Sequence, residues 1–392
     1  MTSPRTARRT SLPGPAVLLV AALVASLAAA LTAGPIGPEP AAAARRPVAK
    51  YAKAGPYPVG VTTLTIGDRE VEVWYPSTRK ATRGERKDAY ELARWLPQGL
   101  QDLLRQQNVE APFTTDAYRD VTGSTDGPFP LVLFAHGFSG WRNQSTFLTT
   151  HIASWGFVVA SPDFLERGLA AQLGAPPATP RAEDEVLDAT IAAVRAASRD
   201  RSSPLSGLVR RGKVAITGHS AGGRTSVLYA SRPQVRTYIP LAGAVFARGG
   251  GEPPPAPDKP SLYLTGADDG IVAVDAIRSY WDGAPAPKRL VVVHGVGHLN
   301  AMSDICEIGK GGGGVVAVAR EAGLPVPDNL ARLGTDGCFP PALPSRQVWP
   351  VTRHFEVAML RYEMGIDATA AQLRPGIVKA WPKLDIEYDV VR

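Results

Sequence analysis

The chain has 392 residues, of which 44% are hydrophobic, and a formal net charge of +7. This composition supports a sizeable core, and the length fits one domain with insertions. The basic residues are spread along the chain with no Lys/Arg stripe interleaved with aromatic side chains, which excludes a nucleic-acid-binding surface.

The N-terminal segment has the three regions of an export signal. Basic residues occupy Arg5–Arg9, an apolar run follows over Ala16–Leu31, and small residues fill Ala41–Ala44. We therefore expect a signal peptide over residues 1–44, removed near Arg45, and a secreted protein. An uncleaved anchor is the alternative, but the apolar run is short and rich in alanine for a stable membrane span. The general secretory and twin-arginine routes both stay open.

The next segment predicts an antiparallel hairpin followed by an insertion. Apolar residues alternate over Val59–Tyr75 and the alternation breaks at Gly67-Asp68, as in a β-hairpin. The region 77–126 is expected to be an insertion. Within it, Ala89–Gln107 predicts two short helices separated at Pro97. These helices either flank the mouth of a pocket or only pack against the domain.

From residue 129 onward, short apolar runs alternate with amphipathic stretches, which predicts an α/β domain with a mostly parallel sheet flanked by helices. The expected strands are Phe129–Ala135, Gly156–Ser161, Lys213–Thr217, Val235–Leu241, Ser261–Thr265 and, as the last core strand, Arg289–Val293. The expected helices are Asn143–Trp155, Glu183–Ala197, Ala221–Ala230, Val315–Ala322 and Val351–Met364. Residues 45–392 are interpreted as a single catalytic domain with a C-terminal extension over 306–392.

A candidate nucleophile stands at the end of the third parallel strand. The residues Gly218-His219-Ser220-Ala221-Gly222 match the Gly-x-Ser-x-Gly nucleophile elbow, with a strand before the motif and a helix after it. The glycines allow the two backbones to approach while Ser220 takes a strained conformation at the apex. The backbone N–H of Ala221 can then meet an oxyanion at the helix N-terminus.

A second oxyanion donor is expected after the first parallel strand. His136-Gly137-Phe138 is the His-Gly-x string found where a loop supplies the other backbone N–H of an oxyanion hole. We assign this donor to Phe138, whose ring is also expected to line the acyl pocket, and expect His136 to shape the loop.

Candidates for the rest of a triad follow two later strands. Asp268 and Asp269 come directly after a strand, where a carboxylate can orient a histidine. The spacing Gly-x-x-Asp favours Asp269, but Asp268 stays an alternative. His298 follows the last strand and is the candidate general base. The chain order from Ser220 through Asp269 to His298 is that of the α/β-hydrolase triad.

The pair His294 and His298 has the spacing of two zinc ligands on a helix. Gly295 and Gly297 argue against a helix there, and no Glu follows the first histidine, so we exclude a zinc site. The only two cysteines, Cys306 and Cys338, predict one disulfide in an exported protein; two unpaired thiols are the alternative.

Together these motifs resemble those of a known family. The segments that carry the resemblance are Val71–Pro76, Phe134–Phe138, Gly218–Gly222 and Gly297–Asn300. They are similar to platelet-activating-factor acetylhydrolase-like serine esterases and to bacterial cutinases and polyester hydrolases, over about Val59–Asp304. The resemblance implies the α/β-hydrolase fold and a serine esterase. Ala221 replaces a Met common in polyester hydrolases, and Ala273-Val274 replaces their Ala-Pro, which weakens the polyester interpretation.

The sequence therefore predicts a secreted, monomeric serine hydrolase that cleaves short-chain, lipid acetyl or polyester esters without a cofactor or metal. The expected substrate-binding residues are Phe138, Trp141, Phe246 and Leu299. Two alternatives are an acyltransferase or peptidase that uses the same triad and a catalytically silent secreted binding protein.

Overall fold

A ten-stranded sheet runs through the computed structural model, which describes residues 46–246, 252–309 and 312–392. The predicted signal peptide lies outside these residues. The strands follow the order β12-β11-β10-β9-β8-β6-β7-β2-β1-β5, and β3 and β4 form a separate pair. Their bounds are β1 Val59–Ile66, β2 Arg69–Pro76, β3 Ala89–Glu91, β4 Pro112–Thr114, β5 Ala117–Arg119, β6 Leu131–Ala135, β7 Val158–Pro162, β8 Val214–His219, β9 Val235–Leu241, β10 Ser261–Gly266, β11 Lys288–Val293 and β12 Ile386–Val391.

The central strands from β7 to β11 are parallel. Every residue of β6, β8, β10 and β11 is buried. Strands covered on both faces need apolar side chains on both faces, which explains their continuous apolar runs. The predicted α/β-hydrolase fold, with its mostly parallel sheet and N-terminal antiparallel hairpin, is confirmed.

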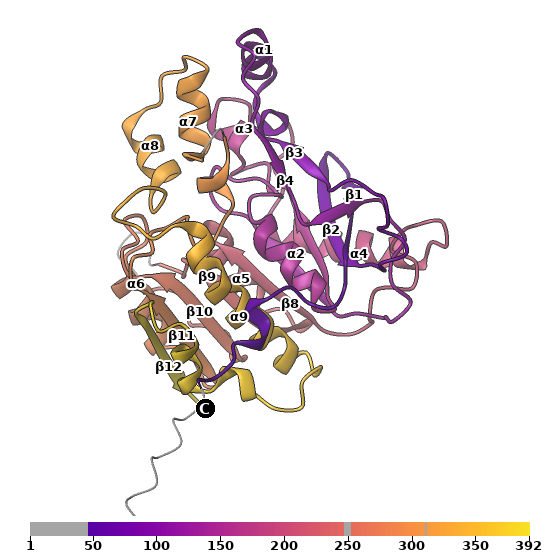
Figure 1. Ribbon diagram of the computed structural model, residues 1–392, viewed down its shortest axis with the longest axis vertical. Helices are drawn as coiled ribbons and strands as arrows, with labels where there is room; N and C mark the ends of the chain where they lie inside the picture. The colour runs from indigo at the N-terminus through magenta and orange to yellow at the C-terminus, as the bar shows by residue number, and fades with distance from the viewer. Residues whose placement is uncertain (1–45, 247–251, 310–311) are drawn as a thin grey trace, which may run out of the picture. The chain divides into compact units, whose positions relative to one another are not determined.

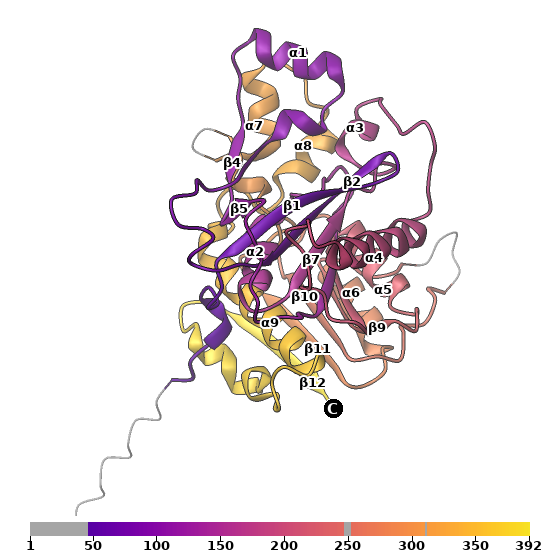
Figure 2. The ribbon, with the colours of Figure 1, turned by 90° about the vertical axis from the view of Figure 1, so that its right-hand side faces the viewer.

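Helices cover both faces of this sheet (Figure 2). On one face α2 (Thr146–Ser154) and α9 (Ser345–Glu363) pack into one apolar core. On the other face α4 (Glu183–Arg199), α5 (Ala221–Tyr229) and α6 (Val274–Asp282) pack into a second core. Short 3-10 helices span Lys50–Ala52, Leu92–Trp95, Ile305–Glu307, Ala371–Leu373 and Pro375–Ala380.

A third apolar cluster lies at the carboxyl end of the parallel strands and joins parts of the chain that are distant in sequence. It contains Leu92 and Leu104 from the insertion, together with Ile305 and Val318 from the C-terminal region. We call the segment 92–104 together with α7 (Gly314–Glu321) and α8 (Asp328–Thr335) the roof. Figure 1 shows α1 (Gln98–Gln106), α7 and α8 on the same side of the sheet, with the short α3 (Leu169–Gln172) beneath α1.

Three regions differ in detail from the expectations. An edge strand that was not predicted, β12, pairs antiparallel with β11 beyond the predicted last core strand. The segment Ala89–Gln107 contains two short helices separated at Pro97, as predicted, but the first is a 3-10 helix and the strand β3 precedes it. The helix predicted from Val351 begins earlier, at Ser345, and continues through Pro350. None of the described helices has the length and apolar character needed to cross a membrane.

Candidate active site

Ser220 stands at the sharp turn between β8 and α5. Its backbone adopts φ 58° and ψ −119°, a region that non-glycine residues rarely occupy without a structural cause. The flanking glycines are required sterically: a Cβ on Gly222 would lie 1.9 Å from the Ala135 carbonyl oxygen, and one on Gly218 would lie 2.4 Å from that of Gly222. The turn therefore brings the first turn of α5 against the end of β6.

His298 is buried and faces the acidic loop after β10. Its Nδ1 lies 2.8 Å from Oδ2 of Asp269, whose other oxygen accepts the backbone N–H groups of Ile271 and Val272 at 2.8 and 2.7 Å. Asp268 instead accepts the N–H of Gly295 at 2.8 Å. Of the two candidate acids, Asp269 therefore contacts His298 and Asp268 does not.

The opposite ring nitrogen of His298 is free to act. Nε2 is buried and has no hydrogen-bond partner among the described residues, and His298 lines the same cavity as Ser220. A base whose Nδ1 is held by a carboxylate and whose Nε2 is unpaired can accept a proton from a neighbouring hydroxyl.

A glutamine that the motifs do not include connects the oxyanion loop to the histidine loop. Gln144 Oε1 accepts the backbone N–H of Gly137 at 2.9 Å, and its Nε2 lies 2.9 Å from Nδ1 of His219. Nε2 of His219 in turn lies 2.9 Å from the carbonyl oxygen of His298. This series has one consistent direction: Gln144 donates to Nδ1, and the Nε2–H of His219 donates to the carbonyl.

The charge state of His219 fits that arrangement. Burial, with a further contribution from His298, lowers the pKa of His219 well below its usual value. The ring is therefore neutral and carries a single proton, which the donor role of Nε2 requires. His136 is also kept neutral, because burial lowers its pKa to about 3, and it accepts the N–H of Phe164 at 2.9 Å.

The C-terminal region supports the histidine loop from the other side. Asp336, just after α8, accepts the backbone N–H of His298 at 2.6 Å and that of Leu299, through its own carbonyl, at 3.1 Å. Asn300 accepts the N–H of Gly297 at 3.0 Å. Sequence spacing carries no signal for Asp336, since it lies 38 residues from His298.

The other predicted features lie nearby. His294 lies 2.7 Å from Glu387 of β12, so it does not share a site with His298. Cys306 and Cys338 form a disulfide, and the loop that it closes contains α7 and α8 of the roof.

A cavity of about 300 Å³ opens beside Ser220 beneath the roof. Phe138, Trp141 and Leu299, which were predicted to bind substrate, line it. Phe246 does not line it: this residue follows the end of β9, and its side chain is 42% exposed. The backbone N–H groups of Phe138 and Ala221 make none of the hydrogen bonds found among the described residues, which leaves both free for an oxyanion.

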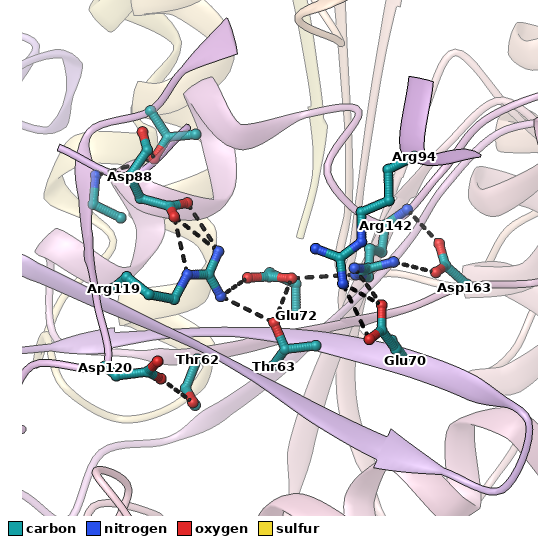
Figure 3. Close-up of polar contacts among 12 residues, drawn as sticks. Thr62, Thr63, Glu70, Glu72, Asp88, Arg94, Arg119, Asp120, Arg142 and Asp163 are labelled. Atoms are coloured by element: carbon teal, nitrogen blue, oxygen red, sulfur yellow. Dashed lines mark hydrogen bonds and ion pairs between the residues drawn. The ribbon is translucent and has the colours of Figure 1, made fainter. Parts of the chain in front are cut away.

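A network of ion pairs joins β2 to β5 and to the end of the oxyanion loop next to this site (Figure 3). Arg142, just after the oxyanion loop, contacts Asp163 at 2.5 Å and Glu72 of β2 at 3.2 Å. Glu72 also pairs with Arg119 of the insertion, which contacts Asp88. Removing one partner of a buried pair leaves an uncompensated charge and costs about 3–5 kcal/mol. Trp95, near the start of the roof, donates its Nε1–H to Asp163 at 3.4 Å, so the network holds this end of the roof in place relative to the oxyanion loop.

The sheet topology and the elbow define the class: the chain has the α/β-hydrolase fold. The family model described as platelet-activating factor acetylhydrolase, isoform II, matches residues 43–184, and that of the dienelactone hydrolase family matches residues 117–301. Each match covers less than half of the chain; both are hydrolase families, and together with the fold they indicate a carboxylic ester hydrolase.

A ferulic acid esterase from Streptomyces cinnamoneus has a similar structure, with a TM-score of 0.52. It is 20% identical to this chain, and the alignment covers 86% of this chain and 98% of that one; at this identity the likeness concerns the fold alone. None of the curated proteins compared with the chain matches it significantly. The segment with α7 and α8 lies outside both family matches.

Proposed function

We propose that this chain is an exported serine esterase in which Ser220, His298 and Asp269 form the catalytic triad. The observation that carries the proposal is the state of His298. Its Nδ1 is held by Asp269, its buried Nε2 has no partner among the described residues, and the residue lines the same cavity as Ser220. Export is supported by the N-terminal segment and by the disulfide, which persists in oxidising compartments.

The mechanism divides into two steps. The Ser220 oxygen attacks the ester carbonyl while His298 takes its proton, and the oxyanion accepts hydrogen bonds from the N–H groups of Phe138 and Ala221. His298 then protonates the departing alcohol, which leaves an acyl group on Ser220. Water, deprotonated by His298, attacks this acyl-enzyme and releases the carboxylic acid. Asp269 keeps Nδ1 protonated and stabilises the imidazolium.

The test is hydrolysis of p-nitrophenyl butyrate by the mature protein and by Ser220→Ala. We expect kcat to fall by at least about a thousandfold in the variant. Ser231→Ala is the matched control, since Ser231 is exposed just after α5, and it should keep full activity. A fluorophosphonate probe should label the wild type at Ser220 and leave the Ser220→Ala protein unlabelled. Equal turnover by Ser220→Ala and the wild type would refute the triad.

Two further measurements separate the remaining alternatives. Asp268→Asn should keep most of the activity and Asp269→Asn should lose it; the reverse result would move the acid to Asp268. Adding an alcohol or amine during turnover tests for acyl transfer, and acid as the main product supports hydrolysis. N-terminal sequencing of the protein recovered outside its producing cells tests export, and a start near Arg45 is expected.

A further inference from the structure

We propose that the cavity beneath the roof binds an unbranched acyl chain of about ten carbons, so that the preferred substrates are medium-chain acyl esters of polar alcohols. This inference rests on the proposed function. It goes further by naming the acyl group, which neither family model determines.

The side chains that line the cavity favour a hydrocarbon group over a polar one. The roof contributes Leu100 and Leu104 of α1, Val318 of α7 and Leu330 of α8, and the floor contributes Trp141 and Leu299. Among the described residues, no Asp, Glu, Lys or Arg side chain lines the cavity. A charged or hydroxyl-rich group placed there would lose its hydrogen bonds to water without replacement, which costs several kcal/mol.

The same argument favours the acyl part of the ester over the alcohol part. Glycerol and sugar alcohols carry hydroxyl groups, for which the cavity has few partners beyond the catalytic residues themselves. A saturated acyl chain needs none, and each buried methylene contributes about 0.8 kcal/mol, or nearly a fourfold gain. The alcohol is then expected to stay on the solvent side, where Phe138 is 46% exposed.

The cavity volume limits the chain length. About 300 Å³ accommodates roughly ten groups the size of a methylene, at about 30 Å³ each, by analogy with the volume of a liquid water molecule. An acetyl group would leave most of the cavity walls without contacts. A palmitoyl chain would exceed this volume unless the roof moved.

Two parts of the roof, α7 and α8, lie outside the regions that match the two families, whereas the segment 92–104 lies within the first match. Both helices lie within the loop that the Cys306–Cys338 disulfide closes, and the cluster that includes Leu104 and Val318 connects α7 to α1. Cavity shape, and hence chain-length selection, is therefore set by segments separate from the triad.

The first experiment compares two ester series below their micellar concentrations. One series is p-nitrophenyl acetate, butyrate, octanoate, decanoate and palmitate, in which only the acyl part grows. The other is acetate esters of straight-chain alcohols, in which only the alcohol grows. We expect kcat/KM to rise more than about a hundredfold from butyrate to decanoate and to fall at palmitate, while the acetate series stays nearly flat.

The second experiment fills the cavity. Ala319 on α7 lines it, whereas Ala317 on the same helix does not. Ala319→Phe should lower kcat/KM for decanoate by about ten- to fiftyfold, because the ring takes the space of about three methylenes, and should lower it much less for acetate. Ala317→Phe is the control and should behave as the wild type toward both esters.

Calorimetric binding of straight-chain fatty acids to Ser220→Ala provides a readout that does not need turnover. Affinity should rise about three- to fourfold per methylene up to decanoate, and Ala319→Phe in the same background should abolish the rise.

Several results would overturn the inference. These are a flat acyl series, a rise confined to the alcohol series, a higher kcat/KM for methyl ferulate than for methyl decanoate, or equal decanoate activity in the two Phe variants. Absence of Ser220-dependent turnover would refute the proposed function, and fatty-acid binding to Ser220→Ala would then show separately whether the cavity assignment holds.

Discussion

Gln144 offers a direct test of how the oxyanion loop is held in place. Its amide satisfies two buried groups at once, the N–H of Gly137 and Nδ1 of His219, each at 2.9 Å. Methionine has a similar length and neither a strong donor nor a strong acceptor. Gln144→Met therefore fills the same space and removes both hydrogen bonds.

The expected effect follows from the two groups left unpaired. A buried polar group without a partner costs about 1–3 kcal/mol. Part of that cost appears in the transition state, because Gly137 directly precedes the oxyanion donor Phe138 and because His219 contacts the carbonyl of His298. A loss of about 1.4–2.7 kcal/mol there lowers kcat about tenfold to a hundredfold. We expect KM to change little, since the substrate's apolar contacts are untouched.

The assay is steady-state hydrolysis of p-nitrophenyl butyrate together with Tm measured by circular dichroism. Gln347→Met is the matched control, because Gln347 is exposed on α9, and it should leave kcat and KM as in the wild type. If Gln144→Met has a kcat within about twofold of the wild type, the positioning role is refuted whatever the change in Tm.

Three further predictions concern the C-terminal region. Burial raises the pKa of Glu356 to about 8 from an ordinary 4.5. The stabilisation that results from this raised pKa is fully present below about pH 4.5, so the free energy of unfolding should fall as the pH rises from there through about 8. Glu356→Gln should remove this fall in urea titrations at about pH 5 and pH 8. Replacing both Cys306 and Cys338 by Ser opens a loop of sequence separation 32 and should lower the unfolding free energy by about 4 kcal/mol, measured by urea denaturation. Asp336→Ala removes the acceptor of the His298 N–H and should lower kcat about three- to thirtyfold with little change in KM, measured with p-nitrophenyl butyrate.

Each of these has a clear contrary result. A wild-type unfolding free energy that stays constant from about pH 5 to pH 8 would show that Glu356 is not protonated in the folded state. A double serine variant as stable as the wild type would show that other contacts alone hold the roof. Full kcat in Asp336→Ala would assign Asp336 a structural role only.

Residues close together in the sequence were the predictable part of the site. The elbow around Ser220 is a pattern within five consecutive residues, so the motif and its flanking strand and helix can be recognised from the sequence, although the contact that requires Gly222 is with Ala135 of β6. The loops with Phe138, Asp269 and His298 follow buried strands, and the carboxyl ends of parallel strands meet at one edge of a sheet. Strand order in the chain therefore suffices to place these loops near one another.

Contacts between distant segments were not predictable in this way. Gln144 contacts His219 across 75 residues, and Asp336 contacts His298 across 38. No motif or regular spacing in the sequence marks either pair. The edge strand β12 was missed because its burial is only partial, so its sequence lacks the continuous apolar run of a central strand.

By itself, the sequence determined the α/β-hydrolase fold, the strained turn at Ser220 and the chain order of the candidate triad, because local sterics and hydrophobic periodicity act over a few residues. Only the tertiary structure decided that Asp269 and not Asp268 contacts His298, and that Phe246 lies away from the cavity. It also decided the shape of the cavity, because the roof brings together side chains from segments more than 200 residues apart, such as Leu104 and Val318. Such packing depends on the volumes and directions of many side chains at once, and no local pattern encodes it.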